Sequence, residues 1–158
     1  MYKRVLVPLD GSPLAETILP FLLEIAGPLD MSVVLLRVNE PIPPAVVEAS
    51  RHVVIDDIEG RRRDAFEYLA PLAVGLRARG IDVDTVVRRG EPATEILAAA
   101  REAKADLIAM TTHGRTGLGR LLFGSVAEAV LRRAEVPVFL MRQTESAVHA
   151  VTGARRAG

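Results

Sequence analysis

The hydrophobic residues of the chain fall into short, mostly apolar runs that alternate with longer segments in which they recur at helical spacing. The short runs predict strands at residues 5–9, 32–38, 83–87, 107–111 and 136–141. Strands that alternate with helices form βαβ units, so the pattern predicts a three-layer α/β/α fold with a five-stranded parallel sheet. Continuous apolar runs such as 107–111 are typical of parallel strands buried on both faces.

Four segments between these strands have the pattern of helices, and their ends carry helix signals. Ser12 and Pro13 provide an N-cap and a proline at the first helical position, and Gly27 ends that helix. The other helices are expected at residues 57–79, after Gly90-Glu91-Pro92, and at 126–133. We expect a bend at Pro20, a kink at Pro71 and a loop over the proline-rich residues 39–50.

Two strand orders, 3-2-1-4-5 and 2-1-3-4-5, are common for such a chain because crossovers are right-handed. Ligands bind at the carboxyl ends of the strands that flank the point where the order reverses. In the first order these are the first and fourth strands, which end in Asp10-Gly11 and in the glycine-containing segment 111–125. These are the strand ends best suited to binding, and their coincidence favours the 3-2-1-4-5 order.

The composition indicates one compact domain and excludes several classes of protein. The chain has 158 residues, of which 49% are hydrophobic, and no cysteine, which excludes disulfides and thiolate chemistry. Its formal net charge of zero predicts no affinity for nucleic acid or for an anionic membrane. No apolar run has transmembrane length, so a cytoplasmic protein is expected. We expect one domain over residues 1–142 and a flexible tail over 143–158.

Gly114 and Gly124 lie between the fourth strand and the last helix, a layout that holds phosphate on backbone N–H groups at a helix N-terminus. Arg115 could add a charge-assisted hydrogen bond to phosphate or could be exposed to solvent. Ser125, with Glu128 three residues later, also fits a capping box, so its hydroxyl serves either the phosphate or the helix. The segment lacks the Walker lysine and the third glycine of a dinucleotide fingerprint, so it does not indicate a P-loop NTPase or a Rossmann dehydrogenase.

Two further residues have side chains suited to chemistry. Asp10 follows the first strand, where its carboxylate could accept from ribose hydroxyls or an adenine amine, or could form a turn. His113 has no carboxylate or histidine neighbours at ligand spacing, so we predict no metal site. No G-x-S-x-G elbow is present, and no residue is assigned a catalytic role.

Several of these segments together resemble the universal stress protein family over nearly the whole chain. The similarity rests on the segments Val5-Leu6-Val7-Pro8-Leu9-Asp10-Gly11-Ser12, Gly90-Glu91-Pro92, Thr112-His113-Gly114-Arg115, Gly124-Ser125 and Val136-Pro137-Val138. The chain is similar to the ATP-binding branch, whose motif is G-x-x-G, nine residues, then G-[S/T]. The resemblance implies a 3-2-1-4-5 sheet of the adenine nucleotide alpha hydrolase-like kind, a homodimer, and ATP, ADP or AMP, with Mg²⁺ as a candidate companion of the phosphates.

The resemblance also implies a role for each matching position. The adenosine end would be lined by Pro8, Leu9 and Asp10, adenine would meet the backbone of Val38, and Met110 and Thr111 would lie near the ribose. The phosphates would be held by Gly114, Arg115, Gly124, Ser125 and Val126. One position departs from the motif, because the first glycine of the family is Thr111 here, and its side chain could crowd the ligand.

Three functions remain open at this point: a dimeric ATP-binding regulatory module of the stress response, a slow ATPase or nucleotide-processing enzyme, and a nucleotide-free dimeric scaffold. Weak ATP hydrolysis fits the first two, and the first implies an unknown regulatory protein partner. The dimer is also indicated by the fifth strand, which begins at Val136 and ends at Met141. It is apolar throughout and contains Pro137, as edge strands do, and an apolar edge favours pairing with a second copy.

Overall fold

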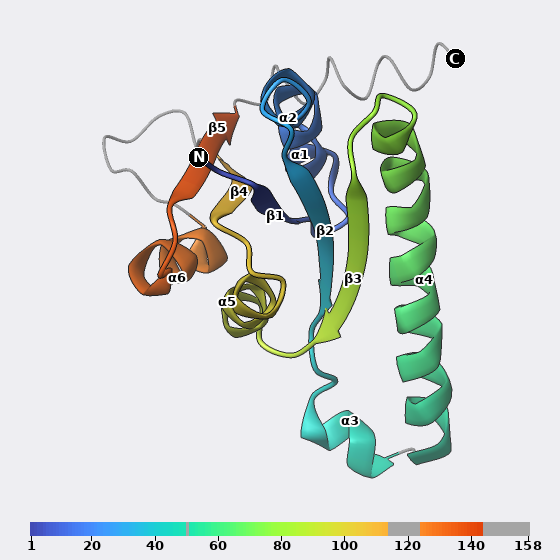
Figure 1. Ribbon diagram of the computed structural model, residues 1–158. Helices are drawn as coiled ribbons and strands as arrows, with labels where there is room; N and C mark the ends of the chain where they lie inside the picture. Colours follow the sequence, from blue (N-terminus) through green and yellow to red (C-terminus); the bar gives the residue numbers. More distant parts are fainter. Residues whose placement is uncertain (50, 114–123, 144–158) are drawn as a thin grey trace.

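The protein folds as one parallel sheet with helices on both faces, and the computed structural model describes residues 1–49, 51–113 and 124–143 (Figure 1). The strands are β1 (Arg4–Pro8), β2 (Ser32–Asn39), β3 (Val83–Arg89), β4 (Leu107–His113) and β5 (Val138–Gln143). The helices are α1 (Pro13–Glu16), α2 (Ile18–Ala26), α3 (Pro44–Ala49), α4 (Arg51–Arg77), α5 (Pro92–Glu102) and α6 (Ser125–Arg133).

The five strands are parallel and lie in the order β3-β2-β1-β4-β5, which confirms the predicted topology. The order reverses between β1 and β4. These two strands pair at only two positions, Val5 with Leu107 and Leu6 with Ile108, whereas β2 and β3 pair over seven. The carboxyl ends of β1 and β4 therefore separate early, and a cavity opens between them.

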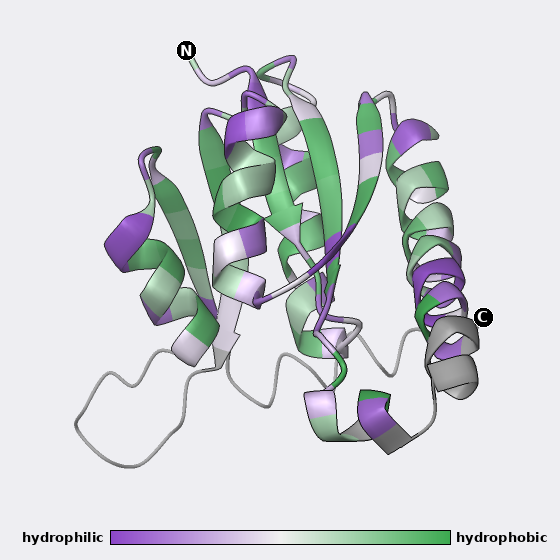
Figure 2. Ribbon diagram, turned by 90° about the horizontal axis from the view of Figure 1, so that it is seen from below, coloured by the Kyte–Doolittle hydropathy of each residue, from purple (hydrophilic) through white to green (hydrophobic). Residues whose placement is uncertain are grey.

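Alternate residues of each strand belong to two separate hydrophobic cores. Val5, Val7 and Ala109 pack on the face covered by α2 and α4. Leu6 and Ile108 pack on the face covered by α5 and α6. Figure 2 shows the strands as mostly hydrophobic and the helices as mixed, which is the pattern expected of a sheet buried on both sides. The short apolar runs of the sequence thus correspond to the central layer.

The first helical segment is interrupted rather than bent. We expected one helix with a bend at Pro20, but α1 ends at Glu16 and α2 begins at Ile18. Pro20 has no N–H for the carbonyl of Glu16 and its ring crowds that carbonyl, so a continuous helix is broken one turn earlier. Ser12 caps α1 as predicted, since its Oγ accepts from the backbone N–H of Ala15 at 3.1 Å.

Other boundaries differ from the sequence prediction. Residues 39–50, expected to be a loop, include α3, because Pro44 occupies the first helical position, where a proline needs no N–H partner. The second predicted helix begins earlier, since α4 runs unbroken from Arg51 to Arg77 with Pro71 inside it. The fifth strand is shifted by two residues, so that Pro137 precedes it and Gln143, expected in the tail, ends it. Residues 144–158 lie outside the described part of the chain.

Candidate functional site

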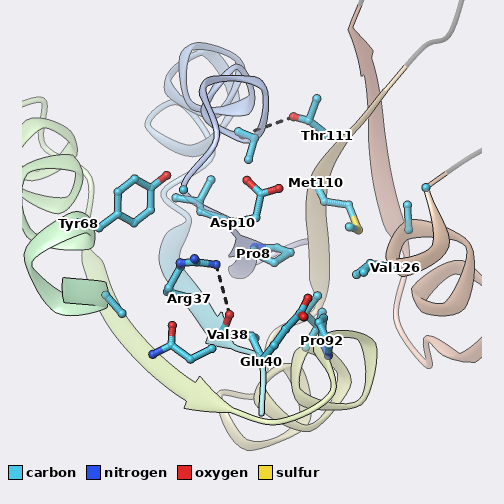
Figure 3. Close-up of a pocket in the computed structure, with 18 of the residues that line it drawn as sticks. Pro8, Asp10, Arg37, Val38, Glu40, Tyr68, Pro92, Met110, Thr111 and Val126 are labelled. Atoms are coloured by element: carbon cyan, nitrogen blue, oxygen red, sulfur yellow. Dashed lines mark hydrogen bonds between the residues drawn. The ribbon is translucent and has the colours of Figure 1, made fainter. Parts of the chain in front are cut away.

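A cavity of about 790 Å³ lies at the carboxyl ends of β1, β2 and β4, at the point where the strand order reverses (Figure 3). The volume is within the range of small-molecule and cofactor sites. Nine of the residues assigned to the nucleotide from the sequence line it: Pro8, Leu9, Asp10, Val38, Met110, Thr111, Gly124, Ser125 and Val126. Gly114 and Arg115 lie outside the described residues. The structure therefore brings the predicted site residues into one cavity wherever it describes them.

Val38 presents a peptide edge to this cavity. The backbone N–H of Leu9 donates to the carbonyl of Leu36 at 2.8 Å, and after this bond β1 leaves the sheet. Alternate residues of a strand direct both backbone groups to the same side, so the N–H and carbonyl of Val38 point where β1 would continue. The carbonyl of Asn39 accepts instead from Gly90 on the β3 side, at 3.0 Å. Val38 thus offers one donor and one acceptor, spaced to pair with the edge of a base.

The start of α6 forms a different wall of the cavity. Gly124 is its N-cap and provides no side-chain cap, so the first backbone N–H groups, on Ser125 to Ala127, lack intrahelical partners. Ser125 is the first helical residue, which shows that the capping-box interpretation of its hydroxyl is wrong. The N–H of Gly124 donates to Oγ1 of the buried Thr112 at 3.4 Å, and this bond ties the helix start to β4. The N–H groups and the helix dipole make this wall suited to an anion.

Thr111, where the family motif has glycine, lies on the opposite face of β4 from α6. Its Oγ1 is 3.5 Å from the carbonyl of Ala15 and 3.5 Å from Oγ1 of Thr17. Figure 3 shows this hydroxyl directed toward the helix that follows β1. Since Met110 and Thr112 belong to the α6 face and Thr111 to the other, its side chain does not stand in front of the helix start.

Asp10 forms a turn and also lines the cavity. Its Oδ1 accepts from the backbone N–H of Ser12 at 2.8 Å, which is an Asx turn. The residue is exposed, and Figure 3 shows the carboxylate near the centre of the hollow. Gly11 beside it has φ of +87°, a conformation that side chains other than glycine's rarely adopt. The two interpretations of Asp10 are therefore compatible, because one oxygen fixes the loop while the carboxylate faces the ligand space.

A polar wall contributed by α4 was not predicted from the sequence. Four residues of this helix line the cavity, at the spacing of one helical face: Arg61, Asp64, Ala65 and Tyr68. The Tyr68 hydroxyl donates to Oε1 of the buried Glu16 at 3.0 Å. Burial is the largest cause that raises the pKa of Tyr68 well above its ordinary value, and the negative charge of Glu16 is the next. The phenol therefore keeps its proton. The 61-64-65-68 spacing was a usable signal, but polar residues on a long helix are usually solvated.

Arg37 was also missed, because a single arginine inside a strand does not indicate which side it occupies. Its guanidinium extends into the cavity and donates from Nη1 to the carbonyl of Val38 at 3.2 Å (Figure 3). A Cβ placed on Gly11 would lie 3.8 Å from Nη2, so the group also adjoins the loop after β1. The cavity therefore contains a positively charged side chain next to the Val38 peptide edge.

Two classes of feature are not found in the described residues. No cluster of three or more histidine, aspartate or glutamate residues there could hold a metal ion. Over the same part of the chain, no helix combines the length and the apolarity needed to cross a membrane.

Known proteins resemble this chain over nearly its whole length. The model of the universal stress protein family matches residues 1–142. Universal stress protein MJ0531 of Methanocaldococcus jannaschii is 32% identical over 145 residues, which cover 90% of this chain and 84% of that protein. The solved structure of MJ0577, from the same organism, has a TM-score of 0.76 and 26% identity, over 90% of this chain and 97% of that one.

A universal stress protein family protein of Arabidopsis thaliana, solved with AMP bound, shares the fold. Its TM-score is 0.65 at 18% identity, over 91% of this chain and 94% of that one. The family match spans nearly the whole chain, and the relative that is 32% identical covers 90% of it. This chain belongs to the universal stress protein family.

Proposed function

We propose that the chain binds an adenine nucleotide, ATP with Mg²⁺ foremost, and acts as a dimeric cytoplasmic regulatory module of the stress response. One observation carries the proposal: a single cavity contains both a base-pairing peptide edge, at Val38, and an uncapped helix start, at Ser125. A nucleotide needs both, because its base is recognised by hydrogen bonds in a plane and its phosphates by N–H groups and positive charge.

At the nucleoside end, the cavity offers the groups that adenosine requires. The N–H of Val38 can donate to adenine N1 while its carbonyl accepts from the exocyclic amine. Pro8, Leu9 and Met110 supply apolar surface for the ring, and the Asp10 carboxylate can accept from ribose hydroxyls. ATP, ADP and AMP share these contacts, and the protein of Arabidopsis thaliana that was solved with AMP bound supports a ligand of this kind.

At the phosphate end, the donors come from the start of α6. The backbone N–H groups of Ser125 and Val126 and the Ser125 hydroxyl can donate to phosphate oxygens. Among the described residues, no atom lies within 4 Å of the position that a Cβ on Gly124 would take, which favours close approach of a phosphate to this backbone. Gly114 and Arg115 enter the proposal through the family motif. Because Thr111 directs its hydroxyl to Ala15, it does not favour the nucleotide-free alternative.

The proposed role is regulatory, and no residue is assigned to catalysis. A bound nucleotide joins β1, β2, β4 and the start of α6, so its presence can stabilise one arrangement of these elements over another. A regulatory protein partner that contacts the mouth of the cavity would distinguish the nucleotide-bound arrangement from the nucleotide-free one. Slow hydrolysis would only set how long the nucleotide-bound state lasts.

The proposed dimer uses β5, the edge strand next to β4. The carbonyl of Pro137 accepts from Ile108 of β4, so the backbone groups of Leu140 point away from β4, toward the outer edge of the described sheet. Replacing Leu140 with proline removes one outward N–H and no bond to β4, which edge strands tolerate. We expect the wild-type protein to have the mass of a dimer by light scattering and Leu140→Pro that of a folded monomer. A monomeric wild type at high concentration contradicts this part of the proposal.

Isothermal titration with Mg-ATP, ADP, AMP and GTP tests the nucleotide proposal directly. Binding of the adenine nucleotides, with mass spectrometry of the purified protein identifying which of them co-purifies, supports it. A matched pair of variants locates the site: Ser125→Asp places a negative charge at the helix start, and Ala70→Asp adds the same charge at an exposed position of α4 that does not line the cavity. We expect the first to weaken ATP binding and the second to leave it unchanged. Absence of heat at high protein concentration would refute the proposal.

A further inference from the structure

Arg37 is a cation at the base end of the cavity, and no carboxylate of the described residues forms an ion pair with it. Its Nη1 donates to the Val38 carbonyl at 3.2 Å, and its guanidinium adjoins Gly11. Other arginines of the fold have partners, such as Arg88 with Glu95 at 2.6 Å. A guanidinium has five N–H donors, so several remain to be directed into the ligand space.

The position of Arg37 constrains whatever pairs with Val38. A carbonyl oxygen has two lone pairs, so the Val38 carbonyl can accept from Arg37 and from a base at once. The two donors then lie side by side on one oxygen. One atom of the base donates to the Val38 carbonyl, and the next atom along the edge of the base therefore faces the guanidinium. Because the guanidinium only donates hydrogen bonds, that next atom must accept one.

Adenine and guanine differ at that atom. Adenine pairs with Val38 through N1 and the N6 amine, and the neighbour of that amine is N7, an acceptor. Guanine pairs with the same two backbone groups through O6 and N1–H, and the neighbour of N1 is the N2 amine, a donor. The peptide edge alone accepts either purine, because both offer an adjacent acceptor and donor. The difference arises only from the charge beside the edge.

We propose that Arg37 is a specificity-determining residue of this site, which donates to N7 of a bound adenine and disfavours guanine. The inference rests on the proposed nucleotide function and deepens it. Hypoxanthine pairs as guanine does but lacks the N2 amine, so it ranks between the two. The order of affinity is therefore adenine, hypoxanthine, guanine, for nucleotides with the same phosphates.

The test compares ATP with 7-deaza-ATP, which has a carbon in place of N7, on the full chain and two variants. Arg37→Met removes the guanidinium and keeps an unbranched side chain. Arg63→Met makes the same change of charge at an exposed position of α4 that does not line the cavity. The quantity compared is the ratio of the dissociation constants of two ligands on one variant. A change in the fraction of folded protein does not affect this ratio.

The wild type and Arg63→Met should bind ATP about tenfold more tightly than 7-deaza-ATP, because a hydrogen bond from a charged donor is worth at least that factor. Arg37→Met should bind ATP and 7-deaza-ATP with equal affinity. The difference between its affinities for ATP and GTP should also be smaller than that of the wild type. Equal binding of ATP and 7-deaza-ATP by the wild type overturns the role of Arg37 and leaves the nucleotide site standing. A wild type that binds no nucleotide refutes the proposed function, and the role of Arg37 with it.

Discussion

Thr111 occupies the position where the family motif has its first glycine, and the structure predicts that restoring the glycine gains little affinity. The Thr111 hydroxyl lies 3.5 Å from the Ala15 carbonyl, on the face of β4 away from α6. Removing the side chain therefore clears no space in front of Ser125. We expect Thr111→Gly to change the dissociation constant for ATP by less than about threefold, which corresponds to roughly 0.7 kcal/mol.

The same substitution should lower stability. Glycine in a strand interior costs about 0.5–1 kcal/mol relative to alanine, and losing a partly buried methyl group adds up to about 0.8 kcal/mol. The bonds at 3.5 Å are at the limit of hydrogen bonding and add little. The sum of about 1.5 kcal/mol lowers the melting temperature by about 3–6 °C for a chain of this size.

Titration calorimetry and thermal denaturation measure the two effects separately. Thr111→Ser serves as the control, since it keeps the hydroxyl and loses only the methyl group. A tenfold gain in ATP affinity for Thr111→Gly would show that the threonine obstructs the nucleotide, and would refute the placement of its side chain on the far face.

Three further predictions concern Thr112, Glu91 and Tyr68. Thr112→Val removes the acceptor of the Gly124 N–H and should weaken ATP binding more than adenosine binding by calorimetry; equal losses would contradict the link to the phosphate end. Glu91 caps α5 by accepting from Ala93 and Thr94, so Glu91→Ala should cost about 1 kcal/mol by urea denaturation. The pKa of Glu91 is lowered, chiefly by hydrogen bonds from Thr94. The Glu91 carboxylate therefore stabilises the fold at neutral pH, and this contribution is lost as pH falls below the pKa of the residue in the unfolded chain. If Glu91→Ala loses stability toward acid pH as steeply as the wild type does, this explanation is wrong. Because the pKa of Tyr68 is raised in the folded protein, the free energy of unfolding should fall as pH rises above about 10, where only the tyrosine of the unfolded chain ionises. Tyr68→Phe should reduce the fall of the melting temperature over this alkaline range. The same fall in both proteins would contradict the buried phenol.

The sheet and its order could be predicted because they follow from features that are local in the sequence. Apolar runs such as 107–111 have few alternatives to a buried parallel strand. Chemistry favoured the order, because the strand ends that carry Asp10 and the glycine segment are the two best suited to binding, and the resemblance to the family implied the same order. The cavity then brought together residues far apart in the sequence, such as Pro8 and Val126, because the carboxyl ends of parallel strands share one edge.

The missed features depend on where a side chain or helix start lies in space. Pro20 indicated a disturbed helix, but the choice between a bend and a break depends on how α1 and α2 pack. Gly124 and Ser125 are both common N-caps, and the Thr112 hydroxyl on a neighbouring strand decides between them. Arg37 could have turned to solvent or into the cavity, and only the end of β1 shows that space is available for it.

In the proposed site, one ligand joins the Val38 peptide edge to the start of α6. Amide ¹H–¹⁵N spectra of the labelled protein, recorded during titration with Mg-ADP, test it at single residues. We expect large, saturable shifts for the Val38 amide and for the amides of Ser125 and Val126, with one dissociation constant, and small shifts for α2. Shifts at the helix start without any at Val38 would contradict it, since they would show a bound phosphate and no recognised base.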